Sequence, residues 1–135
     1  IIGLPARRTF ALRGRTLTVR QLGEVIETRE LDDPLGEIER IRAGFRVPRI
    51  EGLPAFTGGL VGHFGFECIA YIEEKLKSPD KPDQLGTDDV LLMLSEEVAV
   101  FDNLKGRLYL IVHADPGEPQ AQAKAERRLD ELTFR

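Results

Sequence analysis

The sequence is short of several residue types, and each shortage excludes a class of protein. It contains one cysteine, Cys68, so no disulfide can form within the chain. It contains two histidines, and neither has a Cys, His or Asp neighbour at the spacing of metal ligands. No apolar run approaches the roughly 20 residues that a membrane-spanning helix needs. We therefore expect a cytoplasmic protein with no membrane span and no metal site of its own.

Positive charge is not in excess either. Lys and Arg number 19 against 23 Asp and Glu, which gives a net charge of −4 at pH 7. Nucleic acids and anionic membrane surfaces bind basic faces, so we expect neither as a partner. Hydrophobic residues make up 41% and charged residues 31% of the 135 residues, which is typical of a globular domain with a real core.

Both ends of the sequence look like cuts through a longer protein. The first residues, Ile1-Ile2, resemble the tail of a strand, with no initiator Met and no signal-peptide character. The last residues, 133–135, follow a helical pattern without a capping signal. We therefore expect residues 1–135 to be one domain, truncated at both ends.

Hydrophobic periodicity predicts an α+β fold with a mainly antiparallel sheet and about three helices. The predicted strands are 8–12, 16–20, 24–30, 57–64, 90–94, 98–101 and 107–113. Strand 90–94 is a continuous apolar run, so we expect it to be central and buried on both faces. The predicted helices begin at Asp33, near Phe66 and at Pro119, and an exposed loop is expected at 78–83. For the first helix the predicted buried stripe is Leu35, Ile38, Ile41, Arg42 and Phe45.

The segment 52–66 is rich in glycine yet apolar around its glycines, unlike a flexible linker. This pattern is typical of a backbone that packs closely against something, where a side chain would clash. We interpret it as a structural motif at a domain interface, made of Phe56, Gly58, Gly59, Gly62, His63 and Gly65. The alternative is that His63, flanked by glycines, approaches a ligand or a partner.

The residues alone reveal no catalytic, cofactor-binding or metal-binding site. The glycine spacing is followed by no Lys-Ser/Thr pair and does not match the dinucleotide fingerprint. Cys68 is expected to be a small buried residue rather than a nucleophile, and His113 a half-buried strand residue. The paired carboxylates at 73–74 and 96–97 and the paired arginines at 7–8 and 127–128 are interpreted as solvated surface charge.

Three stretches together resemble the N-terminal region of anthranilate synthase component I, the large subunit of that enzyme. They are residues 1–8, the glycine segment 52–67 running into Tyr71, and residues 89–95 followed by 98–103. The motif Phe-x-Gly-Gly-x-x-Gly-x-x-Gly-Phe is fairly specific to this family and to its chorismate-using relatives. His63 stands where members of this family usually have Tyr or another aromatic residue, and Glu67 stands where Asp is common.

The resemblance implies a parent enzyme, a lyase, that converts chorismate and ammonia to anthranilate and pyruvate in tryptophan biosynthesis. It implies a glutamine amidotransferase subunit as the ammonia source, magnesium as the parent's cofactor and tryptophan as a feedback inhibitor. It also implies that this chain is the N-terminal portion of a larger two-layer chorismate-enzyme fold. The C-terminal chorismate-binding domain and the Leu-Leu-Glu-Ser effector motif of the family are absent from these residues.

Three interpretations of the function remain. The first is a regulatory or scaffolding part of anthranilate synthase component I, inactive on its own. The second is the equivalent part of aminodeoxychorismate synthase, which uses the same substrate in the folate pathway. The third is a stand-alone binding module with no enzymatic parent.

Overall fold

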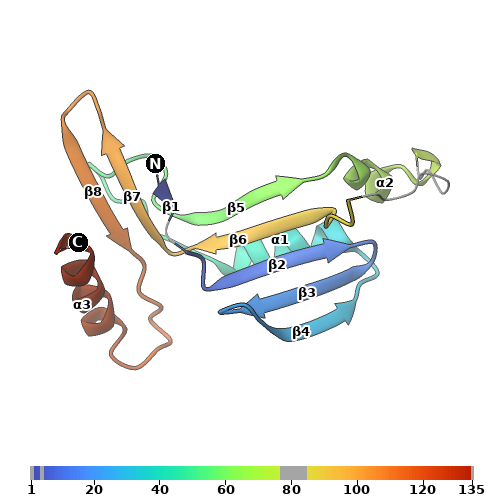
Figure 1. The fold of residues 1–135 in the computed structure, drawn as a ribbon, viewed down its shortest axis with the longest axis horizontal. Helices are drawn as coiled ribbons and strands as arrows, with labels where there is room; N and C mark the ends of the chain where they lie inside the picture. Colours follow the sequence, from blue (N-terminus) through green and yellow to red (C-terminus); the bar gives the residue numbers. More distant parts are fainter. Residues whose placement is uncertain (1, 4, 77–84, 135) are drawn as a thin grey trace. The chain divides into compact units, whose positions relative to one another are not determined.

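A computed structural model describes residues 2–3, 5–76 and 85–134 (Figure 1). The predicted loop at 78–83 lies outside these residues. The fold is α+β with a mainly antiparallel sheet, as expected. The chain divides into two compact units, one formed by residues 1–6, 48–59 and 94–135 and the other by residues 7–47 and 60–93. Nothing in the sequence pattern indicates this division.

The second unit contains most of a five-stranded sheet with the order β4-β3-β2-β6-β5. Its strands are β2 (Arg8–Arg13), β3 (Thr16–Gln21), β4 (Glu24–Glu30), β5 (Gly59–Phe64) and β6 (Val90–Ser95). The first three form an antiparallel meander, with Gly14 in the left-handed region at the first turn. In Figure 1, β6 lies between β2 and β5 and runs opposite to both. The predicted strands are confirmed, although β5 begins two residues later than expected.

Helix α1 (Pro34–Gly44) lies on one face of this sheet (Figure 1). Asp33 caps it as predicted, because its Oδ1 accepts a hydrogen bond from Gly36 N at 2.9 Å. The predicted buried stripe is only partly right: Ile38 is buried, Leu35 and Ile41 are half-buried, and Arg42 and Phe45 are exposed. Glu37 is buried in their place, since Arg29 and Arg40 both form ion pairs with its carboxylate.

Strand β6 is central, as expected, but it is not buried on both faces. Val90, Leu92 and Leu94 are buried, whereas Met93 is 40% exposed. The alternation follows from the sheet, whose successive side chains point to opposite faces.

The helix predicted near Phe66 is broken into three short pieces. They are the 3-10 turn η1 (Phe66–Cys68), the helix α2 (Ile69–Ile72) and the 3-10 turn η2 (Glu74–Leu76). Neither η1 nor α2 has a side-chain cap, and the residues are mostly aromatic or β-branched. Both features weaken a helix, so the apolar spacing alone does not sustain a longer one.

The first unit contains a three-stranded sheet with the order β1-β7-β8 and the helix α3. The strands are β1 (Ile2–Gly3), β7 (Glu97–Asp102) and β8 (Arg107–Val112), and α3 spans Ala121–Thr133. Val98 and Val100 of β7 are buried. The carboxylate of Asp102 accepts hydrogen bonds from Leu104 N and Lys105 N, which shapes the hairpin turn. No residue of α3 is fully buried, so the helix covers a surface, as predicted.

Candidate functional site

The start of the glycine segment lies against His113 in the first unit. Gly58 has φ +139°, and a Cβ there would lie 2.6 Å from Ser95 O and 2.7 Å from His113 Nε2. His113 Nε2 lies 2.7 Å from Thr57 O, the distance of a hydrogen bond that the ring donates. His113 is half-buried, as expected, but it lies directly after β8 and not on the strand. Its ring contacts the glycine segment. Gly58 is therefore required both by its backbone angle and by the close ring.

The remaining glycines of the motif differ in backbone angle and in surroundings. Gly59 has φ +131° but open space where its side chain would be. Gly62, on β5, has an ordinary φ, yet a Cβ there would overlap the carbonyl group of Leu91 on β6. Gly65 N donates to Asp89 O at 2.6 Å. The predicted close packing is thus present at Gly58 and Gly62 and absent at Gly59.

The aromatic members of the motif take no part in a polar cluster. Phe56 is half-buried, and His63 is exposed on β5 with its Nε2 3.4 Å from Asp88 O. The contact of the His63 ring is thus with a backbone carbonyl group. The role of the motif at a domain interface stays a prediction.

A polar cluster that sequence reasoning did not identify gathers around Asp89 in the second unit. Its Oδ2 accepts hydrogen bonds from Gly14 N at 2.7 Å and from the Tyr71 hydroxyl at 2.5 Å. The same hydroxyl lies 2.7 Å from Gly14 O. The Cys68 thiol donates to Asp89 O at 3.1 Å. The cluster thus joins the β2–β3 turn, the residues before β6, and α2.

Both ionisable donors of this cluster are held in their neutral form. Burial, followed by the hydrogen bond to Asp89, raises the pKa of the Tyr71 hydroxyl well above its usual value. Burial, followed by the charge of Asp89, also raises the pKa of the Cys68 thiol. A protonated, buried thiol is a poor nucleophile, so the interpretation of Cys68 as a small buried residue is confirmed. Tyr71 and Asp89 are far apart in sequence, so no local pattern could have paired them.

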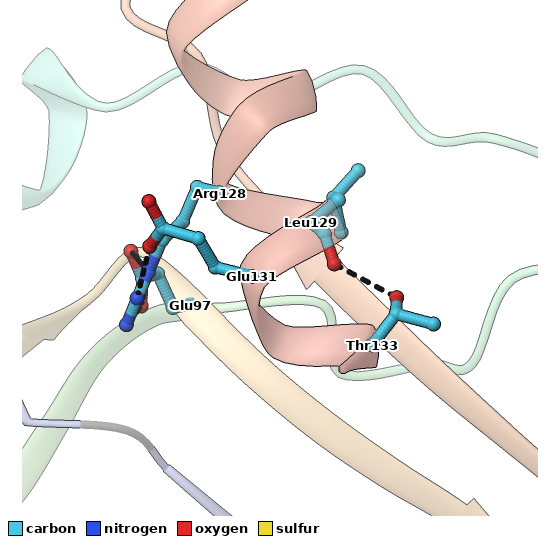
Figure 2. A network of polar contacts seen from close by, with 5 residues as sticks. All are labelled: Glu97, Arg128, Leu129, Glu131 and Thr133. Atoms are coloured by element: carbon cyan, nitrogen blue, oxygen red, sulfur yellow. Dashed lines mark hydrogen bonds and ion pairs between the residues drawn. The ribbon is translucent and has the colours of Figure 1, made fainter. Parts of the chain in front are cut away.

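A second polar network ties α3 to β7 (Figure 2). Arg128 donates to the Glu97 carboxylate through Nε at 3.0 and 3.1 Å and through Nη2 at 3.0 Å. Its Nη1 also contacts Glu131 at 2.9 Å. Hydrogen bonds to Glu97, and then to Glu131, raise the pKa of Arg128. The expectation that Glu97 and Arg128 are independent solvated charges is wrong, because strand and helix place them face to face.

The described residues form a hollow but hold no metal-ligand group and no membrane-spanning helix. A hollow of about 340 Å³ is lined by Gly52, Leu53, Pro54, residues 100–105 and Tyr109, all in the first unit. Among residues 2–3, 5–76 and 85–134, no three His, Cys, Asp or Glu side chains are grouped so that they could hold a metal ion. Within the same residues no helix is long and apolar enough to cross a membrane.

Comparison with known proteins identifies relatives over the whole chain. No family model matches it. Anthranilate synthase component 1 of Pseudomonas aeruginosa is 43% identical over 135 residues, which are 100% of this chain and 27% of that protein. The protein of the same name from Neisseria meningitidis serogroup C is 46% identical over 134 residues, covering 97% of this chain and 27% of the relative.

Comparison with solved structures identifies the same enzyme. The crystal structure of anthranilate synthase component I from Streptococcus pneumoniae matches with a TM-score of 0.74 and 25% identity, over 98% of this chain and 28% of that one. In sequence and fold, this chain is similar to one part of anthranilate synthase component I. The resemblance expected from the sequence is confirmed. The chain spans 27% of the length of these curated relatives, and the glycine segment lies within the matched part.

Proposed function

We propose that the chain is a scaffolding and regulatory part, without catalytic residues of its own, of a longer anthranilate synthase component I. That enzyme would convert chorismate and glutamine-derived ammonia to anthranilate and pyruvate in tryptophan biosynthesis in the cytoplasm. The observation that carries this proposal is the 43% identity to the Pseudomonas aeruginosa enzyme over the entire chain. The matched part is 27% of that enzyme, which leaves room for chorismate binding and catalysis in the remainder.

The contacts of the polar side chains support a scaffolding role. Asp89 is engaged by Gly14 and Tyr71, and Glu97 is engaged by Arg128. The His113 ring is engaged by Thr57 O. Each contact joins two elements that are distant in sequence, and each satisfies a polar group that would otherwise be costly to bury. These side chains therefore serve to hold elements together.

The proposed cofactor and partners belong to the longer protein. Magnesium would supply charge stabilisation for the chorismate carboxylates, and the described residues do not form a ligand set for it. We propose that magnesium and chorismate bind a C-terminal chorismate-binding domain, and that a glutamine amidotransferase subunit supplies ammonia. Tryptophan would act as the effector of the assembled enzyme.

A second candidate is the equivalent part of aminodeoxychorismate synthase. The names of the relatives favour the first candidate, since proteins 40% to 46% identical to this chain carry the name anthranilate synthase component 1. A stand-alone binding module is the third candidate. The length of the relatives disfavours this candidate. The chain covers only 27% of the matched relative, so that protein is several times longer.

Product analysis of the longer protein that contains this chain separates the candidates. The purified protein is incubated with chorismate, magnesium and ammonium, and the products are separated by chromatography. Anthranilate and pyruvate are the expected products. Aminodeoxychorismate would establish the second candidate instead. A reading frame that encodes no chorismate-binding domain beyond these residues would leave only the third.

A further inference from the structure

The two edges of the five-stranded sheet have opposite chemistry. At one edge, β4 carries charge at four of its seven residues: Glu24, Glu27, Arg29 and Glu30. At the other edge, β5 has the sequence Gly-Leu-Val-Gly-His-Phe, with no Asp, Glu, Lys or Arg. The strand order places both at the limits of the sheet, and Figure 1 shows this arrangement.

Charge on an edge strand prevents further pairing, because an incoming strand would have to strip water from the charged groups. The β4 edge has this protection, and the β3–β4 pairing also shifts register between Val19 and Arg20. The β5 edge has neither device. Within the part of the chain that the structure describes, β5 pairs with β6 alone.

Several side chains of β5 and of the residues after it are apolar and exposed. Val61 is 41% and Phe64 is 55% exposed. Four further apolar side chains after β5 are exposed, with the exposed Glu67 and Glu73 between them in sequence: Phe66, Ile69, Ile72 and Leu76. All of these residues lie in the second unit. An uncharged edge followed by such side chains is typical of a site that pairs with another strand.

We propose that β5 accepts a further strand, supplied by the part of the longer protein outside these 135 residues. This rests on the proposed function. The segment would be extended, apolar and uncharged along the side that meets β5, so that its backbone pairs with the free edge. The matched relatives have most of their length outside the matched part, because this chain covers 27% of them.

A second copy of the chain is a weaker occupant on physical grounds. One six-residue edge strand buries far less surface than the roughly 1,200 Å² of a stable interface. A segment of the same polypeptide avoids this limit, since its effective concentration reaches the millimolar range. The edge therefore suits an intramolecular strand.

Hydrogen–deuterium exchange tests the proposal. The 135-residue chain and the longer protein are compared, and we expect the β5 amides to exchange at least tenfold more slowly in the longer protein. The β4 amides should exchange at the same rate in both. Equal β5 rates in the two proteins would overturn the proposal.

Two matched variants of the longer protein identify the occupant. Val61→Lys on β5 should raise the exchange rate of the β5 amides at least tenfold. Val25→Lys on β4 is the control, because it makes the same change at a residue that is also exposed (55%). It should leave the exchange rate of the β5 amides unchanged. Phe64→Lys provides a second β5 variant. If the longer protein sediments as a dimer that Val61→Lys dissociates, the occupant is a second copy and the proposal is wrong.

Anthranilate formation is measured on the same samples. Activity without β5 protection would reject this proposal alone, whereas β5 protection in a protein that forms no anthranilate would reject the proposed function alone.

Discussion

At the scale of single residues, the glycines of the motif are required for separate reasons, and substitution distinguishes them. We expect Gly62→Ala to lower the free energy of unfolding by about 1–3 kcal/mol, because the new Cβ would overlap the Leu91 carbonyl group. Gly44→Ala is the matched control. Gly44 ends α1 with open space around it, so alanine there should be neutral or stabilise by up to about 1 kcal/mol. Urea denaturation measures both, and a Gly62→Ala midpoint equal to the wild type would contradict the close packing of β5 on β6.

Tyr71 is the residue whose loss should most affect the Asp89 cluster. Tyr71→Phe removes the hydroxyl that donates to Asp89, and a hydrogen bond to a charged group contributes about 1.5–3 kcal/mol. Tyr109→Phe is the control, because the Tyr109 hydroxyl has no hydrogen bond within the described residues and lines only the hollow beside the β7–β8 turn. We expect Tyr71→Phe to lower the urea midpoint and Tyr109→Phe to leave it unchanged.

Because of the same cluster, we expect the free energy of unfolding to decrease at alkaline pH. The pKa of Tyr71 is raised in the folded chain above its ordinary value of 10.0, and that of Cys68 above 9.0. At pH values above these ordinary pKa values, the unfolded chain loses protons that the folded chain keeps. The stabilisation is therefore complete below about pH 9 and is lost as the pH rises further. Unfolding midpoints between pH 8 and pH 11 check this, and a midpoint that does not fall would contradict the raised pKa values.

At the scale of elements, Arg128 links α3 to β7 through the Glu97 carboxylate. Arg128→Lys keeps the charge but loses the fork that meets the Glu97 carboxylate. We expect α3 amides to exchange faster in this variant, and the difference to shrink at high salt, since ion pairs near the surface are screened. Arg127→Lys on the same helix is the control. Equal exchange in both variants would show that apolar contacts alone hold α3.

Local patterns predicted most of these elements and little of what joins them. The hairpins were predictable because Gly14 and the 102–106 turn have strong turn chemistry, and α1 because Asp33 and Pro34 mark its start. Burial was less predictable. Glu37 is buried because Arg29 reaches it from β4, which helical spacing cannot indicate. The Asp89 cluster and the ion pair between Glu97 and Arg128 likewise depend on long-range packing, so sequence spacing could not reveal them.

At the scale of the whole molecule, the proposed effector tryptophan should need more of the protein than these 135 residues. We expect the 135-residue chain to bind tryptophan weakly or not at all, because a partial site leaves the ligand's charged groups unpaired. Isothermal titration calorimetry measures this, with the longer protein as the positive control. Micromolar affinity in the 135-residue chain would show that these residues form a sufficient site.

We propose that these residues support an anthranilate synthase without carrying its catalytic groups. Anthranilate fluorescence tests this proposal directly, with the 135-residue chain and the longer protein assayed side by side in chorismate, magnesium and ammonium. We predict steady anthranilate formation by the longer protein and none by the chain alone, because the proposed catalytic groups lie in the rest of the longer protein. Turnover by the chain alone, persisting after removal of any longer enzyme, would contradict the account.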